Sequence, residues 1–295
     1  MKTPRSLGIA ALVLASGTFS LTLRGDDLPR VSADYDVVYS KPGASELKLD
    51  IAWPSDGKGP YPAVLVIHGG AWRTGKKDHM RGMLTEFASR GYVAISPQYR
   101  FCPQEPFPAQ VHDVKAAVRW VKSHASEYKI DPEHVGAVGF SAGGHLALML
   151  GVTGPQDGLE GDAAASDPIT KIQAVVNYFG PTDLAASDIP GESQPLVRDF
   201  LGGKPSDKPD LAAKASPLTF VTKDDAPILT FHGTKDAVVP VTQATKLSEK
   251  LTTTGVPSRA VLLVDSGHGW KGAELKKTMD ETFAFFDQHL KVARP

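Results

Sequence analysis

From Pro62 onward the chain alternates short, almost entirely apolar segments with longer segments that have one apolar face. Uniformly apolar strands are typical of a parallel sheet that helices cover on both faces. The expected strands are residues 63–67, 92–96, 135–140, 172–179, 227–231 and 259–264. The expected helices are residues 77–90, 109–126, 146–150, 241–254 and 275–290. This rhythm predicts an α/β domain built on a mostly parallel sheet.

Two further strand-like runs precede this rhythm, at residues 34–40 and 46–53. In the second run, apolar residues at every other position alternate with polar or small residues, which predicts one buried face. Pro42-Gly43 lies between the runs and supplies the residues of a turn. We therefore expect an N-terminal antiparallel hairpin beside the parallel strands.

Residues 152–170 and 181–226 interrupt the rhythm, since both are rich in Gly, Pro, Asp and Ser. Both are too long for plain connections. Short helical pieces are expected in the second, at residues 195–201 and 208–214. We interpret residues 181–226 as a small cap inserted above the sheet, within one domain that spans residues 30–295.

The N-terminus predicts export. Lys2 and Arg5 precede an uncharged run from Ser6 to Leu23, which is the arrangement of a secretory signal peptide. Residues 1–23 are expected to be removed, leaving a secreted or periplasmic protein without stable membrane association. An uncleaved membrane anchor is the alternative, because the run approaches the length that spans a bilayer. No cysteine lies near the leader, which excludes a lipoprotein anchor.

Charge and cysteine content exclude other classes of protein. The formal net charge is −1 and no run of Lys and Arg is present, which argues against a nucleic-acid partner. A small molecule or a neutral polymer is the expected partner. Cys102 is the only cysteine, so no intramolecular disulfide can form. It lies in a Pro-rich loop and is interpreted as an incidental thiol.

The segment Gly139-Phe-Ser-Ala-Gly143 fits the pattern G-x-S-x-G. In this pattern a strand runs into a sharp turn and a helix, which exposes one serine hydroxyl. The chain has 28 glycines, so the pattern can arise by chance and is weak evidence by itself. The flanking segments therefore decide whether it marks a nucleophile. The strand expected before it and the helix expected after it make Ser141 the candidate nucleophile.

A serine hydroxyl needs a neighbouring imidazole to take its proton. Catalytic groups of such sheets gather just past the carboxyl ends of the strands. Of nine histidines, only His268 and His289 follow the start of the last strand. His289 falls inside the last expected helix, whereas His268 lies in a Gly-flanked loop directly after strand 259–264. His268 is therefore the expected base.

The imidazole in turn needs a carboxylate that holds its tautomer. Asp236 directly follows strand 227–231, whereas Asp224 and Asp225 precede that strand and would lie at the wrong end of the sheet. Asp265 is the alternative, but only three residues separate it from His268. The resulting order of Ser141, Asp236 and His268 is the α/β-hydrolase order.

His68-Gly-Gly-Ala-Trp72 follows the first parallel strand, where backbone amides can point into the site. We expect an oxyanion hole formed by the amides of Gly70, Ala71 and Ala142.

Four aromatic residues flank these motifs and are candidates for substrate contacts, with simple core packing as the alternative. They are Trp72, Phe140, Phe179 and Trp270. His145, one turn past Ser141, is expected to be a structural hydrogen-bonding residue. No metal-binding motif is present, so neither a metal nor another cofactor is expected.

Together these motifs resemble those of α/β-hydrolase-fold esterases, in the group related to hormone-sensitive lipase and to bacterial feruloyl and acetyl-xylan esterases (BD-FAE-like). The resemblance covers roughly residues 35–292. It also includes Tyr178-Phe-Gly-Pro-Thr-Asp183 and Tyr99-Arg100 with Pro106-Phe-Pro-Ala109. The chain has Ala71 where the lipase-like branch usually has a third glycine, which favours the carbohydrate-esterase branch.

The resemblance implies a secreted serine carboxylesterase that hydrolyses short-chain acyl esters, with acetyl esters of plant polysaccharides or oligosaccharides as expected substrates. Ser141 would attack the ester carbonyl, His268 would act as base and acid, and Asp236 would orient His268. One alternative is an amidase or peptidase of the same fold, similar to arylformamidases. The other is a catalytically silent relative that acts as a binding protein, although such relatives usually lose a triad residue.

Overall fold

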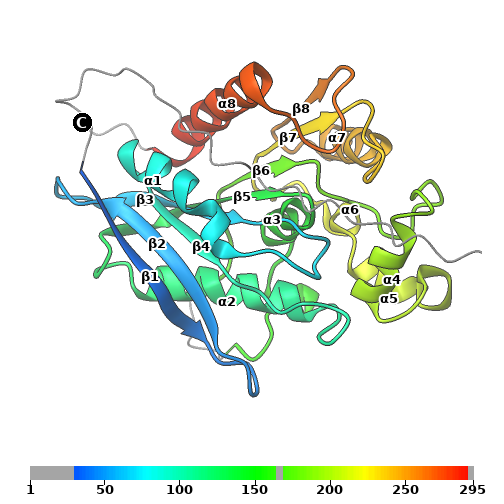
Figure 1. The fold of residues 1–295 in the computed structure, drawn as a ribbon, viewed down its shortest axis with the longest axis horizontal. Helices are drawn as coiled ribbons and strands as arrows, with labels where there is room; N and C mark the ends of the chain where they lie inside the picture. Colours follow the sequence, from blue (N-terminus) through cyan, green and yellow to red (C-terminus); the bar gives the residue numbers. More distant parts are fainter. Residues whose placement is uncertain (1–29, 164–168, 292–295) are drawn as a thin grey trace, which may run out of the picture.

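The computed structural model describes residues 30–163 and 169–291. Its centre is an eight-stranded sheet in the order β1-β2-β4-β3-β5-β6-β7-β8 (Figure 1). The strands are β1 (Val31–Ser40), β2 (Leu47–Pro54), β3 (Tyr61–Ile67), β4 (Val93–Pro97), β5 (Ile130–Phe140), β6 (Ala174–Tyr178), β7 (Ile228–Gly233) and β8 (Ser258–Leu263). From β4 to β8 every pairing is parallel, whereas β1 and β2 pair antiparallel. The predicted α/β-hydrolase sheet is confirmed.

The antiparallel hairpin also forms where the sequence predicts it. Gly43 adopts a positive φ of 57°, and the Ser45 amide donates to the carbonyl of Pro42 across the turn. Gly tolerates this conformation because it has no Cβ. Strand β2 also pairs antiparallel with β4, so the hairpin extends the parallel part of the sheet at one edge.

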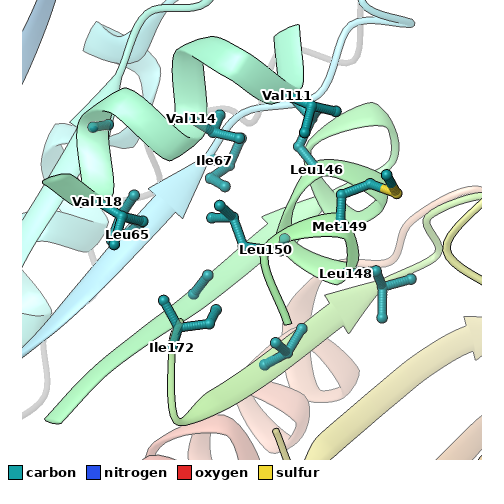
Figure 2. Close-up of a cluster of buried hydrophobic side chains, with 14 of the residues drawn as sticks. Leu65, Ile67, Val111, Val114, Val118, Leu146, Leu148, Met149, Leu150 and Ile172 are labelled. Atoms are coloured by element: carbon teal, nitrogen blue, oxygen red, sulfur yellow. The ribbon is translucent and has the colours of Figure 1, made fainter. Parts of the chain in front are cut away.

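Helices cover both faces of the sheet (Figure 1). One face carries α1 (Arg81–Ser89) and α8 (Gly272–Leu290), and the other carries α2 (Ala109–Ser123), α3 (Ala142–Val152) and α7 (Thr242–Thr254). Each strand buries alternate residues on opposite faces, as the pleat requires. Figure 2 shows Val111, Val114 and Val118 of α2 facing Leu65 and Ile67 of β3.

The helix expected at residues 77–90 instead begins with a 3₁₀ turn, Lys77–Met80, and α1 starts at Arg81. Lys77 is buried and its Nζ lies 2.8 Å from an Asp36 oxygen, with Asp50 as a second partner. Arg81 Nε donates to the other Asp50 oxygen at 2.7 Å. A buried ammonium is tolerated only when it is paired. The ion pairs of Lys77 therefore join this 3₁₀ turn to β1 and β2, which carry Asp36 and Asp50.

Residues 179–227, here called the β6–β7 segment, contain one 3₁₀ turn, Pro205–Asp207, and three short α-helices. These are α4 (Gln194–Leu201), α5 (Pro209–Lys214) and α6 (Pro217–Phe220). The last was not expected from the sequence. Figure 1 shows α4 and α5 together on the side of the molecule opposite the β1–β2 hairpin.

The leader expected at residues 1–23 lies outside the described residues. Within the described part of the chain, no helix combines the length and the apolar character that crossing a bilayer requires.

Candidate active site

Ser141 lies at the turn between β5 and α3, with φ of 54° and ψ of −120°. This conformation is strained for a residue with a Cβ and requires support from its surroundings. The Ser141 amide donates to the Tyr178 carbonyl at 2.8 Å. A Cβ on Gly143 would collide with the carbonyl oxygens of Ile67 and His68, so glycine there lets α3 approach the end of β3. The sharp turn predicted at Ser141 is therefore present.

Three side chains from distant parts of the sequence form a continuous hydrogen-bond chain. Ser141 Oγ lies 2.9 Å from His268 Nε2, and His268 Nδ1 lies 2.7 Å from Asp236 Oδ2. Because an aspartate accepts the proton of Nδ1, Nε2 carries the lone pair that faces the serine hydroxyl. This is the arrangement that activates a serine for nucleophilic attack.

Backbone amides of the loop after β7 hold the Asp236 carboxylate in place. Its Oδ1 accepts hydrogen bonds from the amides of Val238 and Val239 at 2.8 and 2.9 Å. His232, at the end of β7, donates from Nε2 to the Val239 carbonyl at 2.8 Å. Burial lowers the pKa of His232, which keeps that imidazole neutral beside Asp236. The carboxylate is thereby buried, fully hydrogen-bonded and fixed in direction.

The alternative residues lie elsewhere. Asp265 is exposed and pairs with Lys235 at 2.6 Å, so its carboxylate is engaged away from His268. Asp225 accepts from the amide and hydroxyl of Thr222, before the start of β7. His289 packs its ring against Phe285 within α8. Of the candidate acids and bases, the structure brings only Asp236 and His268 to Ser141.

The loop after β3 carries three successive residues with positive φ: Gly70 at 123°, Ala71 at 52° and Trp72 at 56°. The amides of Arg73 and Thr74 both donate to the Gly70 carbonyl, which closes the loop. Ala71 and Ala142 line the same cavity as Ser141, whereas Gly70 is not among its lining residues. Among the described residues no acceptor is found for the Ala71 amide. The Ala142 amide is in the first turn of α3, where helix amides lack partners.

A largely apolar cavity opens beside Ser141, with an empty volume of about 470 Å³ that includes solvent space at its open side. Its walls come from the loop after β3, the β6–β7 segment and the loop after β7. The lining residues are Ala71, Trp72, Ser141, Ala142, Pro181, Asp183, Leu184, Ile189, Ser193, Leu196, Val197, Val238, Val239, Pro240 and Gln243. Such a concave apolar site with few polar groups suits a small organic ligand.

Of the four aromatic candidates, only Trp72 lines this cavity. Phe179 packs its ring 4.7 Å from the ring of His268 and 5.3 Å from that of Trp270. Phe140 lies 4.7 Å from Tyr178, in the core on the α1–α8 side of the sheet. Phe179 therefore packs directly against the base, and Phe140 and Trp270 pack with Phe179 in the core on the α1–α8 side of the sheet.

Sequence reasoning missed most of the cavity wall. Leu184, Ile189, Leu196 and Val197 come from the β6–β7 segment, and Val239 follows Asp236. The signal available in the sequence was their position after β6 and β7, at the carboxyl edge where ligands bind. Nothing in the local pattern indicated which of their side chains would turn towards Ser141.

His145 and Cys102 both lie close to the loop after β3. His145 is buried and its Nε2 donates to the Ala215 carbonyl at 2.8 Å, as a structural residue would. Burial lowers the pKa of His145 to about 4. Cys102 is also buried, and burial raises the pKa of its thiol to about 11. A buried thiol with a raised pKa is a poor nucleophile.

Comparison with known proteins agrees with this architecture. A carbohydrate esterase from gut microbiota (truncated form) has 30% identity and a TM-score of 0.75, covering 88% of this chain and 98% of its own. Esterase Est2 of Thermogutta terrifontis has 27% identity and a TM-score of 0.72, and the match covers 89% of this chain and 92% of the Est2 chain.

The probable carboxylic ester hydrolase LipM of Mycobacterium tuberculosis (strain ATCC 25618 / H37Rv) is 32% identical over 235 residues, which is 75% of this chain and 53% of LipM. Esterase LipQ of the same strain is 29% identical over 239 residues, 79% of this chain and 56% of LipQ. The chain thus spans about half the length of these curated relatives. The BD-FAE family model matches residues 49–251, more than half of the sequence, and the chain therefore belongs to the BD-FAE family within the α/β-hydrolase esterases.

Proposed function

We propose that this protein is a serine carboxylic ester hydrolase in which Ser141 is the nucleophile. The observation that carries this proposal is the hydrogen-bond chain from Ser141 through His268 to Asp236, which opens into an apolar cavity. A chain of this kind is what activates a serine hydroxyl for nucleophilic attack. The esterases among the similar proteins support the same reaction.

In this mechanism Ser141 Oγ attacks the ester carbonyl carbon while its proton passes to His268 Nε2. The amides of Ala71 and Ala142 stabilise the negative oxygen of the tetrahedral intermediate. When the intermediate collapses, His268 returns the proton to the departing alkoxide, and an alcohol leaves. Water then repeats the sequence on the acyl-enzyme: it loses a proton to His268, attacks the carbonyl, and releases the carboxylic acid and Ser141. Asp236 stabilises the imidazolium in both halves.

The cavity favours a short acyl group. Its walls are mainly aliphatic, and its polar residues are engaged by protein groups: Ser193 Oγ donates to the Val238 carbonyl, and Gln243 Oε1 accepts from the Thr182 and Asp183 amides. An acyl chain therefore fits better there than a sugar, whose hydroxyls would lack partners. Structures of Thermogutta terrifontis Est2 with propionate and with butyrate support this assignment.

We extend the proposal to acetyl esters of plant polysaccharides or oligosaccharides, with the sugar outside the cavity and the enzyme secreted or periplasmic. The support is the carbohydrate esterase from gut microbiota and the bifunctional GH43-CE protein of Bacteroides eggerthii, which has a TM-score of 0.76. The basic residues Lys2 and Arg5 before an uncharged run support export.

The test is hydrolysis of p-nitrophenyl esters of increasing chain length, beside acetylated xylan, methyl ferulate and p-nitroacetanilide as an amide. The kcat/KM for the acetate and butyrate esters should exceed that for the octanoate ester by about tenfold or more. Tenfold corresponds to about 1.4 kcal/mol of activation free energy. Ser141→Ala should lower kcat by several powers of ten, whereas Ser206→Ala, at an exposed serine, should keep wild-type activity. A Ser141→Ala protein with more than a few per cent of activity contradicts the mechanism. A rate maximum at C10 or longer contradicts the substrate class.

A further inference from the structure

The amide of Ala71 belongs to a backbone that is strained. Ala71 and the adjacent Trp72 both have positive φ, a conformation that costs roughly 1–3 kcal/mol for each residue with a Cβ. Such a pair of residues persists only when surrounding contacts hold it in place. The position of the proposed oxyanion donor therefore depends on whatever restrains Trp72.

Trp72 is restrained through both its ring and its backbone. Its indole stacks on Phe200 of α4, with ring centroids 4.1 Å apart and an angle of 16° between the planes. Its Nε1 donates to His145 Nδ1 at 3.2 Å, and its carbonyl accepts from the Cys102 amide at 2.9 Å. Trp72 is only 3% exposed, so no water competes strongly for its indole proton.

His145 extends this contact to the β6–β7 segment. Because Nδ1 accepts from Trp72, the proton must be on Nε2, which donates to the carbonyl of Ala215 between α5 and α6. The His145 ring also meets Phe200 edge-on at 5.4 Å. His145 lies in the first turn of α3, where its amide donates to the Ser141 carbonyl at 3.0 Å. Trp72 and the β6–β7 segment therefore meet at the His145 imidazole, and the backbone of the same residue bonds to the Ser141 turn.

We propose that His145 is a positioning residue, which acts through Trp72 to hold the Ala71 amide in place as an oxyanion donor and couples that donor to the β6–β7 segment. The proposal rests on the proposed serine hydrolase mechanism. It implies that the β6–β7 segment, besides lining the acyl cavity, forms part of the support of the oxyanion hole. His145 is not among the cavity-lining residues, so it acts without touching the substrate.

The test uses Trp72→Phe, which keeps an aromatic ring on Phe200 but removes the indole proton, and His145→Leu, which removes both hydrogen bonds. Each should lower kcat for p-nitrophenyl acetate by about tenfold or more with KM within about threefold, since complete loss of one oxyanion donor costs about 10²–10³. Affinity for an alkylboronic acid, which forms a tetrahedral adduct with an active serine, should fall in parallel. The double variant should lose little more than either single variant, because both break the same connection.

Trp120→Phe is the matched control. Trp120 is also buried, but it packs on His124 and Tyr128 near the C-terminal end of α2. The Trp120→Phe variant should keep wild-type kcat. A lowered Tm with unchanged kcat in both test variants would overturn the proposal, and so would multiplicative losses in the double variant. A raised KM with unchanged kcat would make Trp72 a substrate contact instead. An inactive wild-type protein would refute the proposed function, whereas an active wild type with unaffected variants would refute the role of His145 alone.

Discussion

Replacing Asp236 by asparagine tests how the acid controls His268. Oδ1 of Asp236 accepts two amides, from Val238 and Val239, and Oδ2 accepts from His268 Nδ1. In Asp236→Asn the side-chain oxygen must face the two amides, since the opposite orientation would leave two donors facing an NH₂ group. The NH₂ group then faces His268 Nδ1 and can only donate to it. The imidazole is forced to carry its proton on Nε2, against the Ser141 hydroxyl.

The expected loss follows from this reversal of the tautomer. His268 Nε2 lies 2.9 Å from Ser141 Oγ but, once protonated, cannot accept the serine proton. Installing the wrong tautomer in a Ser-His-Asp site lowers kcat by about 10⁴, which corresponds to about 5 kcal/mol. Flipping the amide to restore the tautomer would leave two unsatisfied donors, at a cost of about 1–3 kcal/mol each. The two hydrogen bonds to Oδ1 survive in the favoured orientation, so the free energy of unfolding should change by only about 1 kcal/mol.

The assay is kcat for p-nitrophenyl acetate, measured beside urea unfolding of the same preparation. Asp225→Asn is the control, because the Asp225 carboxylate also accepts from a backbone amide but lies before the start of β7. The Asp225→Asn variant should keep kcat within about twofold of wild type, because a substitution distant from the site acts independently of it. An Asp236→Asn protein that retains more than a tenth of wild-type kcat would show that Asp236 does not set the tautomer of His268.

Three further expectations concern stability and reactivity. Gly143→Ala should destabilise the fold by about 3 kcal/mol in a urea titration, because its Cβ would meet backbone carbonyl oxygens. Gly82→Ala, at a position on α1 with open space around it, should be neutral or stabilising in the same titration. Equal losses of stability in the two variants would disprove the steric argument. Burial lowers the pKa of His68 and His145 from 6.5 to about 4, so the unfolded chain binds more protons in this interval. The free energy of unfolding should therefore fall by about 2 kcal/mol per histidine from pH 7 to pH 5; an unchanged urea midpoint would refute this. Cys102 should react with a thiol reagent only after unfolding, since burial raises its pKa to about 11; labelling of the native protein at the rate of a free thiol would be the contrary result.

Local sequence signals determined the strands, most of the helices and the three residues of the hydrogen-bond chain, but not α6 or the 3₁₀ turn at Lys77–Met80. The run of apolar residues before Gly139 and the glycines around Ser141 define a strand, a turn and a helix without knowledge of the rest of the fold. Asp236 and His268 could be predicted because each directly follows a strand, and the carboxyl ends of parallel strands meet at one edge.

Tertiary structure alone decided what surrounds those residues. The sequence left Asp265 open as an alternative to Asp236. The structure separates them, because Asp236 accepts from His268 Nδ1 at 2.7 Å whereas Asp265 is exposed and pairs with Lys235. Phe140, Phe179 and Trp270 lie next to site motifs in the sequence yet pack outside the cavity, while Leu196 and Val197 reach it from the β6–β7 segment. The physical reason is that periodicity specifies which face of its own element a side chain occupies. Which other element that face meets depends on how irregular segments pack, and their contacts join residues far apart in the chain.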